Sequence, residues 1–389
     1  MIDKNVLLNL LYECYLQARR HKRHTRSQME FEYNLEDNLV KLCDDIFDWS
    51  YEISPSIYFV QQEPIKREIF AWNFRDRIVH HLIFDLISPY REKQFIYDSY
   101  SCRTWKWTMF GVERIRKFMI WASQNFTKNA RILKVDIQWY FMSMDKNILR
   151  WKIKNFIDSW ADFPWKWNSK LFPSGKFIIW NEFPPFLEKI IYDTIFNDPT
   201  KTGIFRWKKS DYIWLPETKS LFYSKPNCGL PIWNLTSQLF SNIYLNDFDH
   251  FVKEKLGIRY YGRYVDDFVL IHDDKEFLKS RIPIIRNYLA ETVHLKLHPK
   301  KIYLQEVKRW VEFLWARIYP YCIHRGRRTI KNFVKMLKST NFNPSRDSLD
   351  SFLWLMMHHR NYGIIYKYLN KIWKENLMFL SDFASSFLE

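Results

Sequence analysis

One stretch decides how this chain folds: Arg259-Tyr260-Tyr261-Gly262-Arg263-Tyr264-Val265-Asp266-Asp267-Phe268-Val269-Leu270-Ile271. Aromatic and β-branched residues on both sides predict two β-strands that meet at a tight turn. The turn holds adjacent carboxylates, Asp266 and Asp267, which repel each other unless a positive charge lies between them. An Asp-Asp pair at a turn is usually only solvated, but a divalent cation is the simplest way to make this pair favourable. Both residues are therefore candidate metal ligands.

A third acid lies near the end of another predicted strand. Residues 130–137 form a short, mostly apolar run that contains Asp136, 130 residues before Asp266. If the two strands are neighbours, Asp136 completes a set of three oxygen donors, which suits Mg²⁺. Two such ions can activate an attacking hydroxyl and stabilise a leaving oxygen in phosphoryl displacement. The pattern predicts nucleotidyl transfer.

The composition points to a polyanionic partner. The 389 residues include 60 Lys and Arg against 43 Asp and Glu, a formal net charge of +17. This excess favours RNA or DNA as a partner over a small metabolite. A chain of this length also predicts two or three packed subdomains.

The chain reads as cytoplasmic. No apolar run approaches the roughly 18 residues of a membrane span, and the N-terminus does not read as a signal peptide. The five cysteines are widely spaced and form no CxxC pair, so neither a zinc module nor a disulfide framework is expected.

Several motifs resemble those of one enzyme family. Tyr264-Val265-Asp266-Asp267 resembles the catalytic box of reverse transcriptases, and Asp136-Ile137-Gln138-Trp139-Tyr140-Phe141 resembles their first palm motif. The run from Leu230 to Gln238 is similar to their loop-helix motif, and its Ser237-Gln238 ending resembles the reverse transcriptases of diversity-generating retroelements. Further blocks match in the same order over roughly residues 45 to 360: Phe74 to His81, Ser101-Cys102-Arg103, His298-Pro299-Lys300-Lys301 and Val311-Glu312-Phe313-Leu314.

The resemblance implies an α+β fold of the right-hand polymerase type. It divides the chain into an N-terminal helical segment (1–48), fingers (49–130), a palm with an antiparallel sheet (131–320, with an insertion at about 158–224) and a small helical thumb (321–389). After Trp310, the sequence pattern predicts a strand pair, Val311 to Ile318 and Cys322 to Ile330, and then a helical, basic segment from Asn332, which the resemblance assigns to the thumb. Its cations are Lys335, Lys338, Arg346, His358, His359 and Arg360.

The resemblance also assigns site residues. Asp136, Asp266 and Asp267 would hold two Mg²⁺ ions. The candidates for the deoxynucleoside triphosphate are Arg67, Arg75, Arg77, Phe141, Ser237 and Gln238. Phe141 would exclude a 2′-hydroxyl, the alternative being a core aromatic residue; the arginines would bind phosphate, although a surface role for Arg67 is equally expected. Candidate nucleic-acid contacts are Lys300 and Lys301, which could instead only solvate a loop, and Phe313 and Leu314, which would hold the primer end.

The implied function is RNA-directed DNA polymerisation. The enzyme would copy a template-repeat RNA into adenine-mutagenised cDNA, bind an RNA–DNA hybrid and work with a small basic accessory variability protein. The alternatives are a retron-type or abortive-infection reverse transcriptase and a catalytically inactive RNA-binding relative.

Tryptophan stands where that family has glycine. The matched positions are Trp105, Trp107, Trp139, Trp233 and Trp315, with weaker matches at Trp49, Trp207, Trp214, Trp310 and Trp354. The chain has 8 glycines and 18 tryptophans, whereas average usage gives about 27 glycines. One hypothesis is that these codons are UGA read as tryptophan where the source organism reads glycine; the other is a diverged, inactive polymerase.

Overall fold

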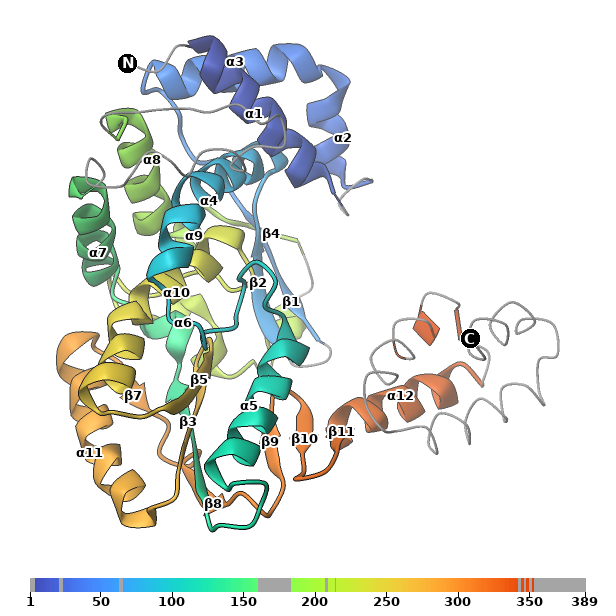
Figure 1. Ribbon diagram of the computed structural model, residues 1–389. Helices are drawn as coiled ribbons and strands as arrows, with labels where there is room; N and C mark the ends of the chain where they lie inside the picture. Colours follow the sequence, from blue (N-terminus) through green and yellow to red (C-terminus); the bar gives the residue numbers. More distant parts are fainter. Residues whose placement is uncertain are drawn as a thin grey trace, which may run out of the picture.

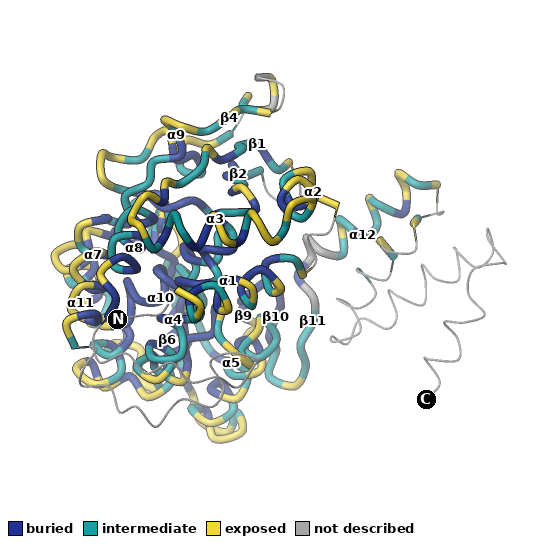
Figure 2. The backbone as a smooth tube through the Cα atoms, turned by 90° about the horizontal axis from the view of Figure 1, so that it is seen from above, coloured by how far each residue is buried: buried dark blue, intermediate teal, exposed yellow. Residues whose placement is uncertain are grey.

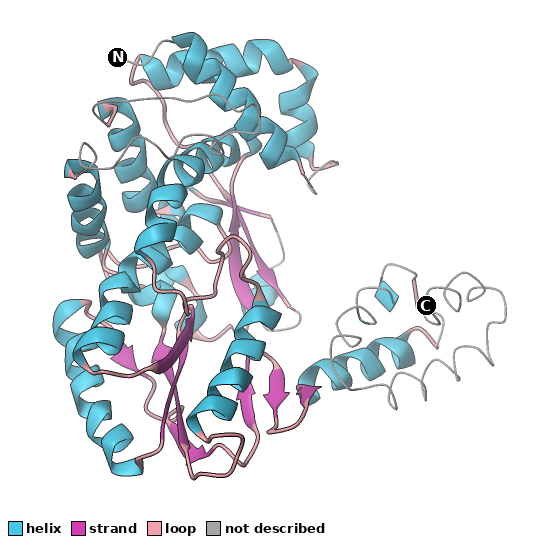
Figure 3. Ribbon diagram, viewed as in Figure 1, coloured by secondary structure: helices cyan, strands magenta, loops and turns pink. Residues whose placement is uncertain are grey.

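The computed structural model combines helices with three small β-sheets (Figures 1 and 3). It describes residues 4–20, 24–62, 66–159, 183–206, 209–213, 215–341, 344–345, 348–349 and 352. The expected thumb residues Arg346, His358, His359 and Arg360 lie outside this part of the chain, as do Trp207, Trp214 and Trp354.

The central sheet is antiparallel and contains both predicted acidic strands. Its order is β5 (Tyr260–Tyr264), β6 (Asp267–His272), β3 (Arg131–Gln138) and β7 (Lys296–Leu297), and β8 (Tyr303–Glu306) also pairs with β3. The predicted neighbourhood of the two strands is therefore present: β3 and β6 pair directly along six residues.

The two faces of this sheet pack against different helices. Because strand side chains alternate, Phe268 and Leu270 of β6 join the main core, which includes residues of α10 (Leu235–His250) and α11 (Lys275–Thr292). Val269 and Ile271 join a second core with α5 (Thr108–Ala122). A π-helical turn, Phe251–Lys255, extends α10. By the same alternation, Asp267 lies on the face that α5 covers.

The N-terminal part of the chain is mostly helical. The N-terminal helices are α1 (Lys4–Arg19), α2 (Arg26–Tyr33) and α3 (Leu35–Phe47), which lie above the long helix α4 (Phe74–Gln94) in Figure 1. Buried residues of α1, α3 and α4 all belong to the main core, and the dark blue segments of Figure 2 follow it through the molecule. The Asn73 side chain caps α4 by accepting from Arg75 N–H at 3.0 Å, as expected for an N-cap asparagine.

The expected insertion contributes to a second sheet. Strands β1 (Ile57–Gln61) and β2 (Arg67–Ala71) form an antiparallel pair, and β4 (Ile204–Phe205) adds to β1 in parallel. The other elements of this half are α6 (Tyr140–Ser143), α7 (Lys146–Asp158), α8 (Pro185–Phe196), α9 (Pro199–Thr202) and 3₁₀ turns at Lys209–Tyr212, Glu217–Lys219 and Leu221–Tyr223.

The C-terminal part of the prediction is corrected in two places. Val311 to Ile318 is a hairpin, β9 (Val311–Phe313) and β10 (Ala316–Ile318), and β10 then pairs with β11 (Ile323–Arg325). Helix α12 begins at Arg327, five residues earlier than expected, and ends at Ser339. It leads away from the central sheet in Figure 1. No helix among the described residues is long and apolar enough to cross a membrane.

Candidate active site

The three predicted carboxylates meet at one end of the central sheet. Asp136 on β3 is the direct partner of Asp267, the first residue of β6. Asp266 precedes it in the two-residue turn that joins β5 to β6, and its carbonyl accepts from Ile137 N–H at 3.0 Å. The Asp136 carbonyl accepts from His298 N–H at 2.8 Å, which ties the loop after β7 to the same place. Backbone pairing alone therefore holds the three acids together.

The turn itself has a strained backbone. Val265 has a φ of 55°, and a left-handed conformation is a genuine outlier for a β-branched residue. Such strain persists only where the surroundings over-determine it, and it concentrates at functional sites.

A buried arginine holds this turn in place. Arg263 donates Nη1–H to the Val265 carbonyl at 3.0 Å. Its Nε and Nη2 donate to the two carboxylate oxygens of Asp249 on α10, each at 2.7 Å, and the Tyr261 hydroxyl donates to the same carboxylate at 2.6 Å. The side chains of Arg263 and Asp249 are both fully buried. The pair thus links the end of α10 to the acidic turn.

Crowding shifts the protonation of the acids. Burial raises the pKa of Asp266 to about 7, and the negative charges of Asp267 and Asp136 add to the rise. Burial also raises the pKa of Asp267, against the lowering effect of Lys134. The site therefore holds more negative charge than its own surroundings favour, which is the condition that a bound cation relieves.

Two lysines, Lys301 and Lys134, partly offset the negative charge of these acids. Lys301 donates Nζ–H to Asp136 Oδ2 at 2.8 Å, and Lys134 Nζ lies 3.4 Å from Asp267 Oδ1. Burial lowers the pKa of Lys301, but its hydrogen bond to Asp136 and the charges of the other acids outweigh this and raise it overall. Lys301, expected to contact nucleic-acid phosphate or only to solvate a loop, forms an ion pair with Asp136, and both Lys300 and Lys301 are exposed.

The donor set fits a hard divalent cation. Among the described residues, no three His, Cys, Asp or Glu side chains already converge as a metal site, and Asp136 and Asp267 are each paired with a lysine, Lys301 and Lys134. Asp267 Oδ1 is buried and accepts no hydrogen bond. Its charge is partly offset by Lys134 Nζ at 3.4 Å. A carboxylate oxygen in this state, beside two further acids, suits a hard cation such as Mg²⁺.

The loop before α10 lies near two of the predicted triphosphate residues. The Arg67 guanidinium, at the start of β2, lies 5.8 Å from the centre of the Trp233 ring. Phe141 is half-buried on α6, directly after β3, and its carbonyl accepts from Leu230 N–H at 2.8 Å. The fold therefore brings Arg67, Phe141 and the 230–238 segment together.

The remaining predicted residues of this group differ in their surroundings. Arg75 is already paired with Asp45 at 2.7 Å and stacks over Tyr51, which favours a structural role. Among the described residues, the Arg77 guanidinium has no acidic partner, and burial lowers its pKa. Ser237 is buried and Gln238 half-buried in the first turn of α10.

The predicted primer-end residues are part of the core. Phe313 is fully buried and Leu314 is 7% exposed, and both pack in the cluster that α5 shares with the central sheet. Their side chains therefore belong to the hydrophobic core on this face of the sheet.

Sequence reasoning did not identify Lys134, Asp249 and Arg263 as site residues. Lys134 lies two positions before Asp136 on the same strand, so strand alternation would have placed it on the same face. Nothing comparable indicates that Asp249 and Arg263 pair, because the contact depends on how α10 packs against β5.

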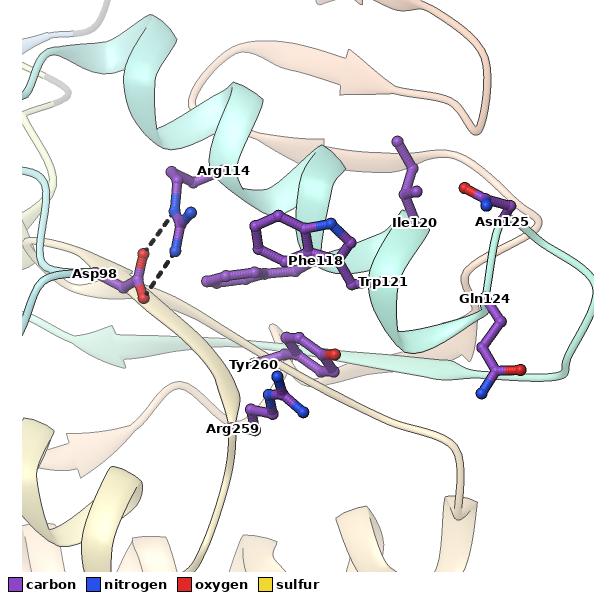
Figure 4. Close-up of a pocket in the computed structure, with 9 residues that line it drawn as sticks. All are labelled: Asp98, Arg114, Phe118, Ile120, Trp121, Gln124, Asn125, Arg259 and Tyr260. Carbon is purple, nitrogen blue, oxygen red and sulfur yellow. Dashed lines mark hydrogen bonds and ion pairs between the residues drawn. The ribbon is translucent and has the colours of Figure 1, made fainter.

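A separate cavity of about 530 Å³ lies between α5 and β5 (Figure 4). Arg114 in its wall is paired with Asp98 at 2.9 Å, and Arg259 lies over the ring of Tyr260. None of the three aspartates predicted to bind metal lines it.

Comparisons with known proteins give only distant similarity. No family model matches the chain, and no curated protein matches it. Similar solved structures include a telomerase from Candida albicans in complex with a fragment of telomeric RNA (12% identity, 77% of this chain and 50% of that chain, TM-score 0.45). Two others are telomerase from Candida tropicalis: an apo form truncated from its C-terminal domain (14% identity, 73% and 59% of the two chains, TM-score 0.43) and an apo form (10% identity, 69% and 48%, TM-score 0.44). The chain spans about half the length of the telomerase chains it matches.

Proposed function

We propose that this protein is an RNA-directed DNA polymerase of the diversity-generating class. The observation that carries the proposal is the arrangement of Asp136, Asp266 and Asp267 at one end of the central sheet, beside a strained turn that Arg263 holds. A purely structural hairpin has no need to place three acids beside a strained turn.

In this proposal Asp136 and Asp266 are the principal ligands of two Mg²⁺ ions, with Asp267 beside them. When bound, such ions lower the pKa of an attacking hydroxyl and stabilise the leaving oxygen. The chain's own residues do the rest. Backbone hydrogen bonds from Ile137 and His298 keep the carboxylates in register, and Arg263 fixes the turn that carries Asp266.

In this proposal, the residues that select the nucleotide lie around the loop that precedes α10. Arg67 and Arg77 bind the triphosphate, since a guanidinium presents fixed donors that match phosphate oxygens. Phe141 closes the sugar side and favours deoxynucleotides, while Ser237 and Gln238 lie at the start of the helix that faces the new base pair.

Helix α12 provides a basic surface for the duplex. Lys331, Lys335 and Lys338 are exposed and recur at helical spacing, whereas Phe333 and Leu337 on the other side are fully buried. Such a row binds the phosphate backbone of a template RNA or an RNA–DNA hybrid without reading its sequence. A small basic accessory protein would then assist in presenting the RNA.

The first test is primer extension on an RNA template with Mg²⁺ and deoxynucleotides. It uses a parent protein that carries glycine at the loop positions where tryptophan stands in place of the family's glycine: 105, 107, 139, 233 and 315. Asp266→Asn is expected to abolish the product, whereas Asp273→Asn, which removes an exposed carboxylate just beyond β6, is not. No product from the parent protein, or equal product from both variants, would refute the polymerase.

The second test concerns nucleic-acid binding by α12. Exchange of Lys331, Lys335 and Lys338 for glutamine is expected to weaken hybrid binding and to reduce the slope of log affinity against log salt by up to about 3. The control exchanges three exposed lysines elsewhere, Lys41, Lys128 and Lys275. An equal change of slope in the control would remove α12 from the proposed interface.

A catalytically inactive RNA-binding relative is the second candidate, favoured by Trp139 and Trp233 in loops next to Asp136 and Arg67. It predicts RNA binding without primer extension even after glycine is restored. A retron-type or abortive-infection enzyme would extend a primer but would lack a neighbouring template and variable repeat pair with mismatches confined to template adenines.

A further inference from the structure

Five tryptophans have a backbone conformation that suits glycine. Trp49, Trp105, Trp139, Trp233 and Trp315 have φ values of 64°, 62°, 54°, 71° and 69°. An L side chain in this left-handed region brings its Cβ close to the following carbonyl oxygen, and glycine is the default residue there. Among the described residues with positive φ, no other non-glycine residue type occurs as often; asparagine, which tolerates this region, occurs three times.

The β9–β10 hairpin shows the requirement most clearly. Its two-residue loop is Leu314 and Trp315, and both have positive φ, 51° and 69°. Two positive φ values define a type I′ turn, whose second position is typically glycine. The missing glycine signal is also why the sequence predicted one continuous strand here.

The other positions have their own local reasons. Trp49 follows Asp48, the C-cap of α3, and donates N–H to Ile46 O at 3.3 Å, so it holds the C′ site where helices usually end in glycine. Trp105 is the third residue of a turn closed by Lys106 N–H and Arg103 O at 3.1 Å, the position that requires positive φ in a type II turn.

Packing does not explain why tryptophan stands at these places. The five side chains are between 38% and 82% exposed, so the indoles gain little burial in return for the strain. Trp72 is the contrast: it is 7% exposed, its ring centre lies 4.6 Å from that of His80 at a tilted angle, and it has no positive φ. Among the described tryptophans, others such as Trp121 and Trp151 are similarly exposed, so the left-handed backbone, and not exposure alone, distinguishes these five.

We propose that the functional protein carries glycine at positions 49, 105, 139, 233 and 315, encoded by UGA. UGA is read as tryptophan in some genetic codes and as glycine in others, so a single codon assignment exchanges these two residues and no others. Trp107, with a φ of −117°, and Trp310 do not share the left-handed backbone, so at these two positions the structure does not require glycine.

Glycine at two of these positions changes the candidate active site. Position 139 lies three residues after Asp136 and two before Phe141. At position 233, the Trp233 ring lies beside the Arg67 guanidinium. Without the indoles, both loops can approach a nucleotide closely. This consequence rests on the proposed function, whereas the backbone argument does not.

The direct test is the gene sequence together with mass spectrometry of the protein purified from its source organism. UGA is expected at the five positions and UGG at Trp72, and the native peptides covering 139 and 233 are expected to contain glycine. UGG codons, or tryptophan in those native peptides, would overturn the proposal.

A recombinant test separates conformation from loss of the side chain. Trp139→Gly and Trp315→Gly are each expected to raise the thermal midpoint by roughly 1–3 °C, since glycine relieves the left-handed strain. Trp139→Ala and Trp315→Ala remove the same indoles and keep the strain, so they should not. Trp72→Gly, the control, should lower the midpoint; equal effects of glycine and alanine at 139 and 315 would contradict the proposal. If the five-glycine protein is more stable but extends no primer, the glycine assignment stands and the polymerase proposal fails.

Discussion

The β5–β6 hairpin carries two centres of buried charge that are built in opposite ways. In the first, Arg263 and Asp249 match one guanidinium to one carboxylate through two hydrogen bonds of 2.7 Å. In the second, Asp136, Asp266 and Asp267 share two lysines, and one oxygen of Asp267 is left without a hydrogen bond. The first centre is neutral within the chain, whereas the second keeps an excess of negative charge.

Under the proposed function, this difference separates a charged pair that shapes the fold from acids that bind metal. A buried pair such as Arg263 and Asp249 contributes little net stability compared with apolar residues of the same volume. Arg263, however, also binds the carbonyl of Val265, the strained residue next to Asp266. The Arg263–Asp249 pair therefore fixes the position of the turn that carries Asp266.

The largest effect is expected from removing one charge of the acidic centre. Asp136→Asn should lower primer extension by roughly 10³-fold or more, about 4 kcal/mol of transition-state stabilisation. Its unfolding free energy should stay the same or rise, because two like charges remain instead of three. Parallel measurements of extension rate and urea unfolding check both; a variant that loses stability along with activity would place Asp136 in a structural role.

Removing one charge of the Arg263–Asp249 pair should instead lower the stability of the protein. Arg263→Met leaves Asp249 buried and unpaired, so the unfolding free energy should fall by about 3–5 kcal/mol. Chemical denaturation measures this loss.

A double variant shows whether the Arg263–Asp249 pair only balances its own buried charge or also positions the turn at Val265. Arg263→Met combined with Asp249→Leu removes both charges and should recover most of the stability. Primer extension should nevertheless stay low, since Val265 no longer has its hydrogen-bond donor. Full recovery of activity in the double variant would show that the pair only maintains the core.

The acidic centre should also make stability depend on pH. The pKa of Asp266 is raised to about 7 in the folded protein, from an ordinary 3.8. The folded state then holds the proton more tightly, so this contribution is full below about pH 4 and is lost as the pH rises to about 7. Because Asp266 is only partly buried, the loss should be about 1 kcal/mol. The difference in urea midpoint between the parent and Asp266→Asn, measured with EDTA at pH 5 and 7.5, isolates it; a difference that grows with pH in the parent's favour would contradict the assignment.

The sequence predicted the acids better than their partners. Asp266 and Asp267 are adjacent, and Asp136 lies on a strand whose apolar character required a neighbour, so pairing β3 with β6 was sufficient to unite them. The partner of Lys301 depends on where the loop after β7 lies, which local patterns do not determine. The position of Lys301 in the chain suggested either a phosphate contact or a solvated loop, and nothing in the sequence indicated the ion pair with Asp136 that the fold forms.

The hairpin at 314–315 was missed for a different reason. Turn prediction depends on residues that favour positive φ, and Leu314 and Trp315 are not such residues. The predicted strand therefore ran through the turn at Leu314 and Trp315, where both residues have positive φ.

The smallest expected effect tests whether the lysines substitute for a cation. Lys301 is 49% exposed, so Lys301→Gln should cost less than about 1 kcal/mol of stability without metal. Its absence leaves Asp136 without its ammonium partner, so added Mg²⁺ should raise the thermal midpoint more in Lys301→Gln than in the parent. Lys300→Gln, an exposed neighbour, is the control and should behave like the parent. If Mg²⁺ stabilises Lys301→Gln less than the parent, Lys301 supports the metal site instead of competing with it, and the acidic centre would be positioned by that lysine as well as by Arg263.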